Sequence, residues 1–496
     1  MAQRIDRAAS FGQNLYVDTR GAAGEPVPFT QAVINGLAQG GGLYVPEELP
    51  TLSLDEICAL ARLPYAQRAA AIYKAFNVDL PDEAIDELMG RAYGDNFDDE
   101  AICPITSLDE STHILELWHG PTSAFKDMAL QCLPHFFSAS AEKLREEGTL
   151  DHEFMILVAT SGDTGKAALE GFKGVDGVSI GVLFPDGGVS DIQRKQMVTT
   201  TGDNVQVWAV RGNFDDAQTG VKRVFGDKAI AARLAERNIR LSSANSINWG
   251  RLVPQIVYYF YGYLRAVERV GEEVVFAVPG GNFGNAYACW VAKKMGLPIM
   301  RLIVCTNEND AMDEFLRTGR YAPKPSSETI ATSSPSTDIS RAASFERFLF
   351  DVLGRDGARV RELAEDLKTK GEFTLTAEEF RKVRLSGVVS GSSNHPNRLE
   401  IIEQMHLEYD TYVDPHTADA LFSGIYLHPV GVKTLCVETV QAVKFPRMVR
   451  QATGVAVEPP EDMADLFSRP LRKVQTPACE AAVREEIERL TERPDA

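Results

Sequence analysis

Short, wholly apolar runs recur along the chain, each followed by a turn of small residues and then by a segment with helical periodicity. FMILVA (154–159) precedes TSGDTG (160–165), and VVFAVP (274–279) precedes GGNFGN (280–285). A third run, VSIGVLFP (178–185), also ends in a turn. Runs that are apolar on both faces and alternate with helices are typical of parallel strands whose sheet is covered on both sides. The pattern therefore predicts an α/β fold of mostly parallel sheets covered by helices.

The stretch LWHGPTSAFKD (117–127) leads into a predicted helix. Apolar residues recur at helical spacing over 125–136, which predicts a helix that begins near Ser123. Pro134 would kink or end this helix, because proline lacks a backbone N–H. Lys126 would then lie in the first helical turn.

The order of these patterns divides the chain into three parts. Residues 1–100 mix turns with amphipathic segments and form an N-terminal mixed or helical domain, expected to be a structural cap, with a regulatory element as the alternative. Residues 101–340 form the α/β core, with a larger and a smaller subdomain. Residues 341–496 supply the remainder of the large domain and the C-terminal helices. The Ser/Thr/Pro-rich stretch 323–340 predicts an irregular connection, and the tail after Pro446 predicts surface helices.

Composition narrows the class of protein. The 496 residues are 44% hydrophobic and 24% charged, as in an ordinary globular protein, and the net charge of −19 argues against nucleic acid as the main partner. No apolar run approaches membrane-spanning length and the first residues lack an apolar signal core, so we expect a cytoplasmic protein. The seven cysteines form no Cys-x-x-Cys and no His-Glu-x-x-His occurs, so neither disulfides nor a metal site is expected.

Two glycine-rich turns, 160–165 and 280–285, lie where a strand passes into a helix. Small residues there let backbone N–H groups face a ligand, and the helix N-terminus adds partial positive charge, so each turn is a candidate anion site. The alternative is a tight turn that uses glycine for backbone reasons only. Neither turn has the spacing of a Walker loop or of a dinucleotide fingerprint. The expected ligand is a phosphate on something other than a nucleotide.

Two further elements add candidate chemistry. NSINWGR (245–251) combines Asn245, Ser246 and Arg251, which suit a phosphate or a carboxylate, although a helix cap followed by a surface arginine would show the same pattern. Lys126 suits an amine nucleophile whose pKa falls on burial, although this position taken alone favours a solvated lysine paired with its neighbouring aspartate. An amine, two phosphate-type turns and a third anion cluster together point to pyridoxal phosphate and a phosphorylated substrate.

The order of the motifs resembles the threonine synthase family, in the longer form found in many bacteria and fungi. YVDTRG, HGPTSAFKD, ATSGDTGKAAL, NSINWGR, VPGGNFGNAYA, TNEND, SPSTDI and DPHTADA follow the family's order over nearly the whole chain. The resemblance implies a fold-type-II pyridoxal-phosphate enzyme, of the tryptophan synthase β-like architecture with an N-terminal extension. The oligomeric state, a monomer or a simple homo-oligomer, is left open.

The resemblance also implies roles for individual residues. Lys126 would be the catalytic lysine that forms the Schiff base with pyridoxal phosphate. The other cofactor-binding residues would be Gly281, Asn282, Phe283, Gly284 and Asn285 around the phosphate, and Thr439 at the pyridine nitrogen. The substrate-binding residues would be Ser161, Thr164, Asn245, Ser246 and Arg251. No metal is implied.

The implied reaction is the last step of threonine biosynthesis: O-phospho-L-homoserine and water give L-threonine and phosphate, by γ-elimination and β-addition of water. The chain departs from the family pattern at three places. Gln441 and Ala442 replace His-Pro, AASFER (342–347) replaces SSNFER, and Thr337 replaces methionine. These departures keep open the alternative of a threonine-synthase-like phospho-lyase that releases a 2-oxo acid. An alternative of another class is a non-catalytic regulator that binds a phosphorylated metabolite, against which the presence of Lys126 argues.

Overall fold

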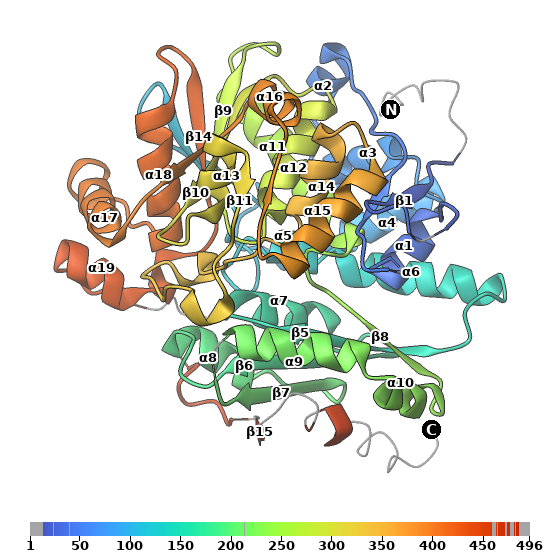
Figure 1. The fold of residues 1–496 in the computed structure, drawn as a ribbon. Coiled ribbons are helices and arrows are strands. Elements are labelled where there is room, and N and C mark those ends of the chain that lie inside the picture. Colours follow the sequence, from blue (N-terminus) through green and yellow to red (C-terminus); the bar gives the residue numbers. More distant parts are fainter. Residues whose placement is uncertain are drawn as a thin grey trace.

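The computed structural model describes residues 13–485 apart from 23, 39, 213, 459–462, 464, 472–473, 477–480 and 482. Two separate sheets form the frame of the molecule, one above the other in Figure 1, with helices packed on their faces. The first twelve residues, and in the predicted C-terminal tail Cys479 and residues 486–496 among others, lie outside the described residues. In the part of the chain that is described, no helix is long and apolar enough to cross a membrane.

The larger sheet has six strands, all parallel except for one antiparallel edge pair, β3–β4. Its spatial order is β13 (Val388–Ser392), β10 (Ile299–Thr306), β9 (Val274–Pro279), β14 (Lys433–Glu438), β4 (Thr112–Glu116) and β3 (Ile105–Ser107). Successive side chains of a strand point to opposite faces, so each apolar run fills two cores. One core is shared with α11 (Trp249–Ala266) and α12 (Gly284–Lys294), the other with α17 (His395–Tyr409), α18 (Pro415–Leu427) and α19 (Pro446–Thr453).

The smaller sheet has five strands, all parallel. Its order is β15 (Val474–Thr476), β7 (Val205–Val210), β6 (Val178–Pro185), β5 (Glu153–Ala159) and β8 (Ile239–Ser242). Helix α7 (Asp163–Phe172) covers one face, while α9 (Phe214–Gly226) and α10 (Lys228–Ala235) cover the other. Helix α8 (Asp191–Val198) packs against α7. The mostly parallel α/β fold expected from the apolar runs is confirmed, whereas the tail was expected to be helical only and in fact adds β15 to this sheet.

The N-terminal region packs into the same core as the larger sheet. It comprises β1 (Tyr16–Asp18), α1 (Phe29–Asn35), β2 (Tyr44–Pro46), α2 (Leu54–Leu60), α3 (Tyr65–Ala75) and α4 (Asp82–Ala92). The Tyr16 ring lies against the Trp249 ring of α11, and the Phe29 ring lies edge-on to the Phe136 ring. Its role as a cap stays a prediction, as do the three domain boundaries.

The prediction of a helix that begins near Ser123 is wrong. Two helices occupy this stretch, α5 (Asp127–Leu130) and α6 (Leu133–Glu146), and Lys126 is the residue that caps the first. Ser123 has φ +53° and Ala124 pairs with Val440 in an isolated β-bridge, so the chain just before Lys126 is not helical. Pro134 lies in the first turn of α6, where its missing N–H leaves no helical hydrogen bond unmade.

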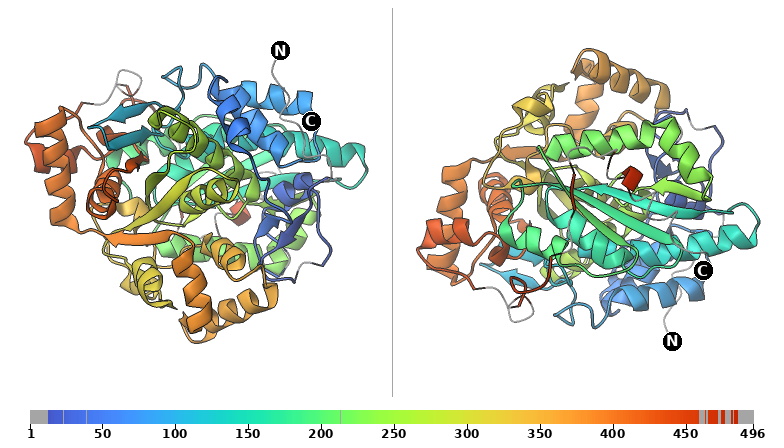
Figure 2. Two further views of the ribbon diagram at one scale, coloured as in Figure 1. Left: turned by 90° about the horizontal axis from the view of Figure 1, so that it is seen from above. Right: turned by 90° about the horizontal axis from the view of Figure 1, so that it is seen from below.

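The segment between β10 and β13 forms a separate group of helices at one side of the sheets, coloured yellow to orange in Figure 2. It comprises α13 (Ala311–Thr318), β11 (Arg320–Tyr321), α14 (Phe345–Val352), α15 (Gly357–Thr369), β12 (Phe373–Thr374) and α16 (Ala377–Leu385). The stretch 323–340 is irregular apart from two short 3-10 turns, Ser326–Glu328 and Pro335–Thr337, which confirms the prediction of an irregular connection.

Candidate active site

A cavity of about 580 Å³ lies between the two sheets, beside the carboxyl ends of β5, β9 and β14. Thr160, Gly280 and Thr439, which follow those strands, all line it. In α/β proteins ligands bind at the carboxyl ends of parallel strands. The predicted site residues that line the cavity are Lys126, Ser161, Thr164, Asn245, Ser246, Arg251, Gly281, Asn282, Gly284, Asn285 and Thr439. The fold thus brings together eleven of the twelve predicted residues, and Phe283 is the exception.

The loop that carries Lys126 is fastened to the end of β14. The Phe125 N–H donates to the Thr439 carbonyl at 2.7 Å. The Gln441 N–H donates to the Ser123 carbonyl at 3.2 Å. These main-chain bonds fix the place of the Lys126 amine relative to Thr439, two residues that are more than 300 positions apart in the sequence.

Asp127 holds this loop from inside and does not pair with the neighbouring lysine. Its two carboxylate oxygens accept hydrogen bonds from the Thr122 N–H (2.8 Å) and from the Thr122 hydroxyl (2.7 Å). A Cβ at Gly120 would lie only 2.4 Å from the Asp127 Cβ, so the loop needs glycine there. The reading of Lys126 as a solvated charge is wrong, because its side chain is only 11% exposed.

Lys126 faces a different carboxylate, that of Asp163 at the start of α7. Its Nζ lies 3.9 Å from Asp163 Oδ2, and the Lys444 Nζ donates to Asp163 Oδ1 at 2.9 Å. Burial lowers the pKa of Lys126 to about 8, with Asp163 opposing the drop and with Arg251 and Lys444 adding to it. Burial alone would raise the pKa of Asp163, but the two lysines outweigh it and hold this pKa well below its usual range.

The turn before α7 requires glycine for steric reasons. Gly162 has φ +136°, and a Cβ there would lie 2.5 Å from the Gln193 side chain. The Thr160 hydroxyl accepts hydrogen bonds from the N–H groups of Gly162 (3.0 Å) and Gly165 (2.9 Å). This internal bonding uses N–H groups that an anion would otherwise take, and it aims Asp163 at the two lysines.

The turn before α12 is more open to an anion. Its capping residue, Phe283, has φ +65° and offers no side-chain hydrogen bond to the first helical turn. The Phe283 ring packs against Phe345 and Phe348 instead of facing the cavity. Because the first N–H groups of a helix lack partners within it, this end of α12 is suited to bind phosphate.

Asn285, in the first turn of α12, is oriented by two buried tyrosines. The hydroxyls of Tyr258 and Tyr259 each donate to Asn285 Oδ1 at 2.5 Å. The Asn285 side-chain amide nitrogen is buried and has no partner within the described protein. Since both donors lie on α11, this helix fixes the amide.

Arg251, also on α11, is buried beside the cavity. Its Nη1 donates to the Ala244 carbonyl at 2.7 Å, while its Nε is buried without a partner in the described protein. Burial lowers the pKa of Arg251 to about 10, so it stays a cation at neutral pH. The alternative reading of a surface arginine after an Asn/Ser cap is wrong, because the cap is Asn248 and Arg251 is 5% exposed.

A second buried arginine, Arg347 on α14, holds the 245–247 loop from behind. It donates to the Ser246 carbonyl at 2.9 Å, to the Ile247 carbonyl at 2.5 Å and to the Tyr44 carbonyl at 3.0 Å. The Ser344 hydroxyl also donates to the Ser246 carbonyl, at 3.1 Å. At position 344, where the family commonly has asparagine, this chain thus has a serine that contacts the predicted substrate loop.

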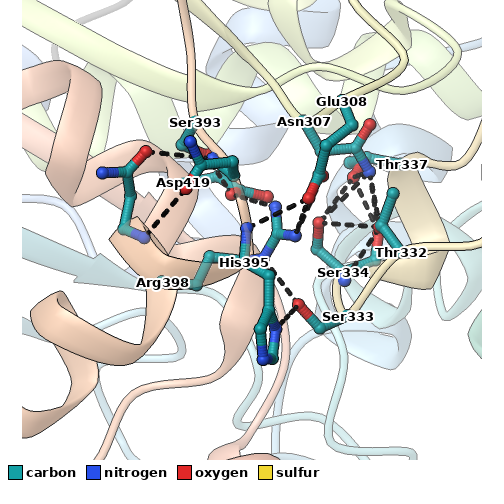
Figure 3. Close-up of polar contacts among 12 residues, drawn as sticks. Asn307, Glu308, Thr332, Ser333, Ser334, Thr337, Ser393, His395, Arg398 and Asp419 are labelled. Atoms are coloured by element: carbon teal, nitrogen blue, oxygen red, sulfur yellow. Dashed lines mark hydrogen bonds and ion pairs between the residues drawn. The ribbon is translucent and has the colours of Figure 1, made fainter.

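The loop around 330–338, which lines the far side of the cavity, is anchored by a polar network (Figure 3). Arg398 of α17 lies between two carboxylates, at 3.0 Å from Asp419 and 2.8 Å from Glu308. Its Nε donates to the Ser333 hydroxyl at 2.8 Å. The network ties this loop to α17, α18 and the end of β10, so the cavity wall is fixed from outside.

Two departures from the family pattern have different surroundings here. Thr337 joins the network: its hydroxyl accepts from Asn307 at 3.0 Å and donates to the Ser334 carbonyl at 2.8 Å. Gln441 contributes its backbone N–H to the lysine loop, but its side-chain oxygen is buried without a partner in the described protein. The structure gives no physical reason for glutamine at position 441.

His416, another cavity residue, connects this loop to α18. Its Nε2 accepts from the Ser336 N–H at 2.9 Å and its Nδ1 lies 2.6 Å from Asp414. The two contacts fix the tautomer with the proton on Nδ1. The Ser336 hydroxyl in turn lies 3.4 Å from Asp163.

Sequence reasoning missed four residues of this site: Asp163, Lys444, His416 and Arg347. Asp163, His416 and Arg347 lie inside TSGDTG, DPHTADA and AASFER, which are described above, and Lys444 lies two residues after the Gln441–Ala442 departure. Each of the four carries a charge or a titratable group among small or apolar neighbours, and this contrast could have identified them as candidates. Their partners lie far away in the sequence and are visible only in the fold.

The residues present fit pyridoxal phosphate. The unpartnered Asn285 amide nitrogen and Arg251 Nε are buried donors beside one cavity, and buried donors without partners are costly unless a ligand meets them. The open start of α12 suits the cofactor's phosphate, and Lys126 is the amine that it needs. In the described ranges, no group of three or more His, Cys, Asp or Glu side chains could hold a metal ion.

Comparison with known proteins agrees with this geometry. Residues 15–93 match the family described as "Threonine synthase N terminus", and residues 109–370 match "Pyridoxal-phosphate dependent enzyme". The chain is 40% identical to the threonine synthase of Methylobacillus glycogenes, over 92% of this chain and 96% of that protein. It is 39% identical to that of Corynebacterium glutamicum, over 95% and 98%.

A solved structure is similar as well. The crystal structure of PLP-bound threonine synthase from Brucella melitensis superposes with a TM-score of 0.88 at 36% identity, covering 97% of this chain and all of that one. Sequence and fold therefore agree over both the N-terminal region and the core. The chain belongs to the threonine synthase family of pyridoxal-phosphate-dependent enzymes.

Proposed function

We propose that this enzyme converts O-phospho-L-homoserine and water into L-threonine and inorganic phosphate, by γ-elimination of phosphate followed by addition of water at Cβ. The observation that supports this most strongly is the cavity that holds the Lys126 amine together with two groups suited to phosphate. One group is the start of α12 and the other includes Arg251. Two phosphate positions on either side of one amine suit a phosphorylated cofactor and a phosphorylated substrate.

The cofactor would be held by residues that follow the carboxyl ends of two strands, β9 and β14. Gly281, Asn282, Gly284 and Asn285 would bind its phosphate, with Phe283 contributing its backbone only, and Thr439 would contact the pyridine nitrogen through a neutral hydroxyl. Bound pyridoxal phosphate supplies an electron-withdrawing ring that stabilises negative charge at the substrate Cα. All other steps fall to the side chains of this chain.

Lys126 would move the protons. A proton must leave Cα and another must leave Cβ before phosphate departs from Cγ. Cγ then gains a proton and becomes the methyl group, water adds at Cβ, and Cα is reprotonated. An amine with a pKa of about 8 exchanges protons close to neutral pH, which an ordinary surface lysine does poorly. The hydrogen bonds that fasten the lysine loop to β14 would keep the amine on one face of the substrate.

Arg251, with Asn245, Ser246 and Thr164, would hold the substrate phosphate, and Ser161 would contact the substrate beside them. The cation is buried and stays charged at neutral pH, so it can stabilise the negative charge on the departing phosphate. Arg347 and Ser344 bind the carbonyl of the 246 position and would preorganise this pocket without touching the phosphate.

Product analysis tests the proposal. Purified holoenzyme supplied with O-phospho-L-homoserine should release threonine and phosphate in a ratio of about one, since one water is consumed per phosphate released. Phosphate accompanied by 2-oxobutyrate instead of threonine would identify a phospho-lyase, the reading that the Gln441 and AASFER departures keep open. If neither threonine nor 2-oxobutyrate is formed, the reading as a non-catalytic regulator remains.

Covalent labelling of the lysine separates the enzyme readings from the regulator. Borohydride reduction of the coloured holoenzyme should place the cofactor on Lys126. Lys444 is the internal control, because it is buried beside the same carboxylate yet does not line the cavity. Label on Lys444, or a colourless protein that takes up no pyridoxal phosphate, would contradict the proposed role of Lys126.

A further inference from the structure

Asp163 and Lys444 form an ion pair with no exposed surface, next to the Lys126 amine. The Lys444 Nζ lies 2.9 Å from Asp163 Oδ1, and both side chains have 0% exposure. The second carboxylate oxygen, Oδ2, lies 3.9 Å from the Lys126 Nζ. Asp163 begins α7 on the smaller sheet, whereas Lys444 lies in the 3-10 turn Ala442–Lys444 that follows β14 on the larger one. One carboxylate, on the smaller sheet, therefore lies beside two lysines that belong to other elements.

Stability alone is a weak reason to keep such a pair. Removing two charges from water costs several kcal/mol, and apolar side chains of the same volume commonly do as well or better. The geometry offers a better reason, because Lys444 takes one oxygen of Asp163 and leaves the other directed at Lys126. The Ser336 hydroxyl, 3.4 Å from Oδ2, is a further polar neighbour on that side, and the Gln193 side chain also helps to hold the pKa of Asp163 down.

Four charged side chains act on the Lys126 amine. Asp163 from α7 favours its protonated form, while Arg251 from α11 and Lys444 from the 3-10 turn disfavour it. Asp127, the next residue along the chain, favours it to a smaller extent, because its oxygens are engaged by Thr122. Asp163 is therefore the carboxylate that balances the two cations.

We propose that Asp163 is a positioning residue: it holds the Lys126 amine at the cavity wall whenever that amine is not bonded to the cofactor, and Lys444 fixes Asp163 in place and shares its charge. This inference rests on the proposed function, in which the freed amine carries the protons. A carboxylate 3.9 Å away directs the amine without bonding it tightly, so the amine can still reach substrate carbons.

The arrangement predicts opposite effects for two substitutions. Asp163→Asn removes the negative charge, which makes protonation of Lys126 less favourable and lowers the pH at which the amine titrates. Lys444→Met removes a positive charge and leaves all of the Asp163 charge to Lys126, which raises that pH. Each shift should be about one pH unit, as expected for one charge added or removed within several ångströms in a buried site. A merely structural pair would destabilise both variants without shifting the titration in opposite directions.

The test is the pH dependence of acylation of Lys126 in the full-length chain after its cofactor has been removed. Trace acetic anhydride is applied at a series of pH values, and the modified lysines are quantified by peptide mass spectrometry. The unaltered chain should show a midpoint near pH 8 for Lys126. The exposed Lys370 serves as the internal standard to which the extent of Lys126 modification is normalised.

Asp79→Asn is the matched control. It neutralises a largely buried carboxylate that pairs with Lys143 and accepts hydrogen bonds from Thr30, and neither Asp79 nor Lys143 lines the cavity. It should therefore lower thermal stability and leave the Lys126 midpoint in place. If Asp163→Asn yields no folded protein, Lys444→Met and Lys444→Gln carry the test, with the midpoint expected to rise in both.

Unchanged midpoints, or shifts in the same direction for Asp163→Asn and Lys444→Met, would overturn the inference. This outcome is distinct from failure of the proposed function. In the latter case the unaltered holoenzyme would form no threonine from O-phospho-L-homoserine, whatever the midpoints show.

Discussion

At the scale of single residues, the site depends on a few buried charges that have no room to be solvated. Lys126, Asp163 and Lys444 form one group, and Arg251, which lines the same cavity as Lys126, is a further buried cation. A buried cation with an unpartnered N–H is expensive unless a ligand anion meets it. The contribution of Arg251 to the use of the phosphorylated substrate can therefore be measured by truncating its side chain to alanine.

Arg251→Ala should lower kcat/KM for the phosphorylated substrate by about 10²–10³, since it removes a preorganised donor to the departing phosphate. Affinity for pyridoxal phosphate should change far less, because the start of α12 binds the cofactor phosphate. Steady-state kinetics and a cofactor titration followed by absorbance give the two numbers. Arg265→Ala, at the other end of α11, is the control. Equal losses in substrate use and cofactor affinity would refute the assignment.

At the scale of elements, the turn before α7 should be the most sensitive to a methyl group. Gly162→Ala forces a side chain into a backbone conformation that L residues rarely adopt, and it drives a Cβ to 2.5 Å from Gln193. We expect a loss of about 2–4 kcal/mol in the free energy of unfolding, measured from urea midpoints.

Gly174→Ala is the matched comparison, because Gly174 has φ +71° with no atom within 4 Å of the added Cβ. It should cost only about 1 kcal/mol, from the backbone alone. Equal losses at the two positions would show that the contact with Gln193 does not matter and that the turn is held by backbone conformation only.

The elements also show what the sequence could reveal. The apolar strands and the glycine turns at 160–165 and 280–285 were predictable because their signals are local. The start of α5 was not, because the chain before it has a positive φ at Ser123 and a bridge from Ala124 to Val440, just after β14 and far along the chain. The Asp163–Lys444 pair joins residues 281 positions apart, so no local pattern could pair them. Local motifs thus located the site, and long-range packing decided its charges.

At the scale of the whole molecule, the N-terminal region should be needed for folding. Deleting residues 13–100 would expose Phe136 and Trp249, rings that are buried against this region. We expect aggregated protein or strong binding of the dye ANS, since a large apolar surface would face water. A truncated chain that unfolds cooperatively and binds pyridoxal phosphate as tightly as the full chain would indicate a regulatory element instead of a cap. The cytoplasmic location and the lack of a nucleic-acid partner stay predictions from composition.

The most direct measurement of the reaction is the fate of oxygen from labelled water. Holoenzyme is incubated with O-phospho-L-homoserine in H₂¹⁸O, and the products are analysed by mass spectrometry. Elimination breaks the bond between Cγ and oxygen, and water then adds at Cβ. The hydroxyl of threonine should therefore carry one ¹⁸O, and the released phosphate should carry none. Homoserine with ¹⁸O-labelled phosphate, or 2-oxobutyrate in place of threonine, would contradict the proposed function.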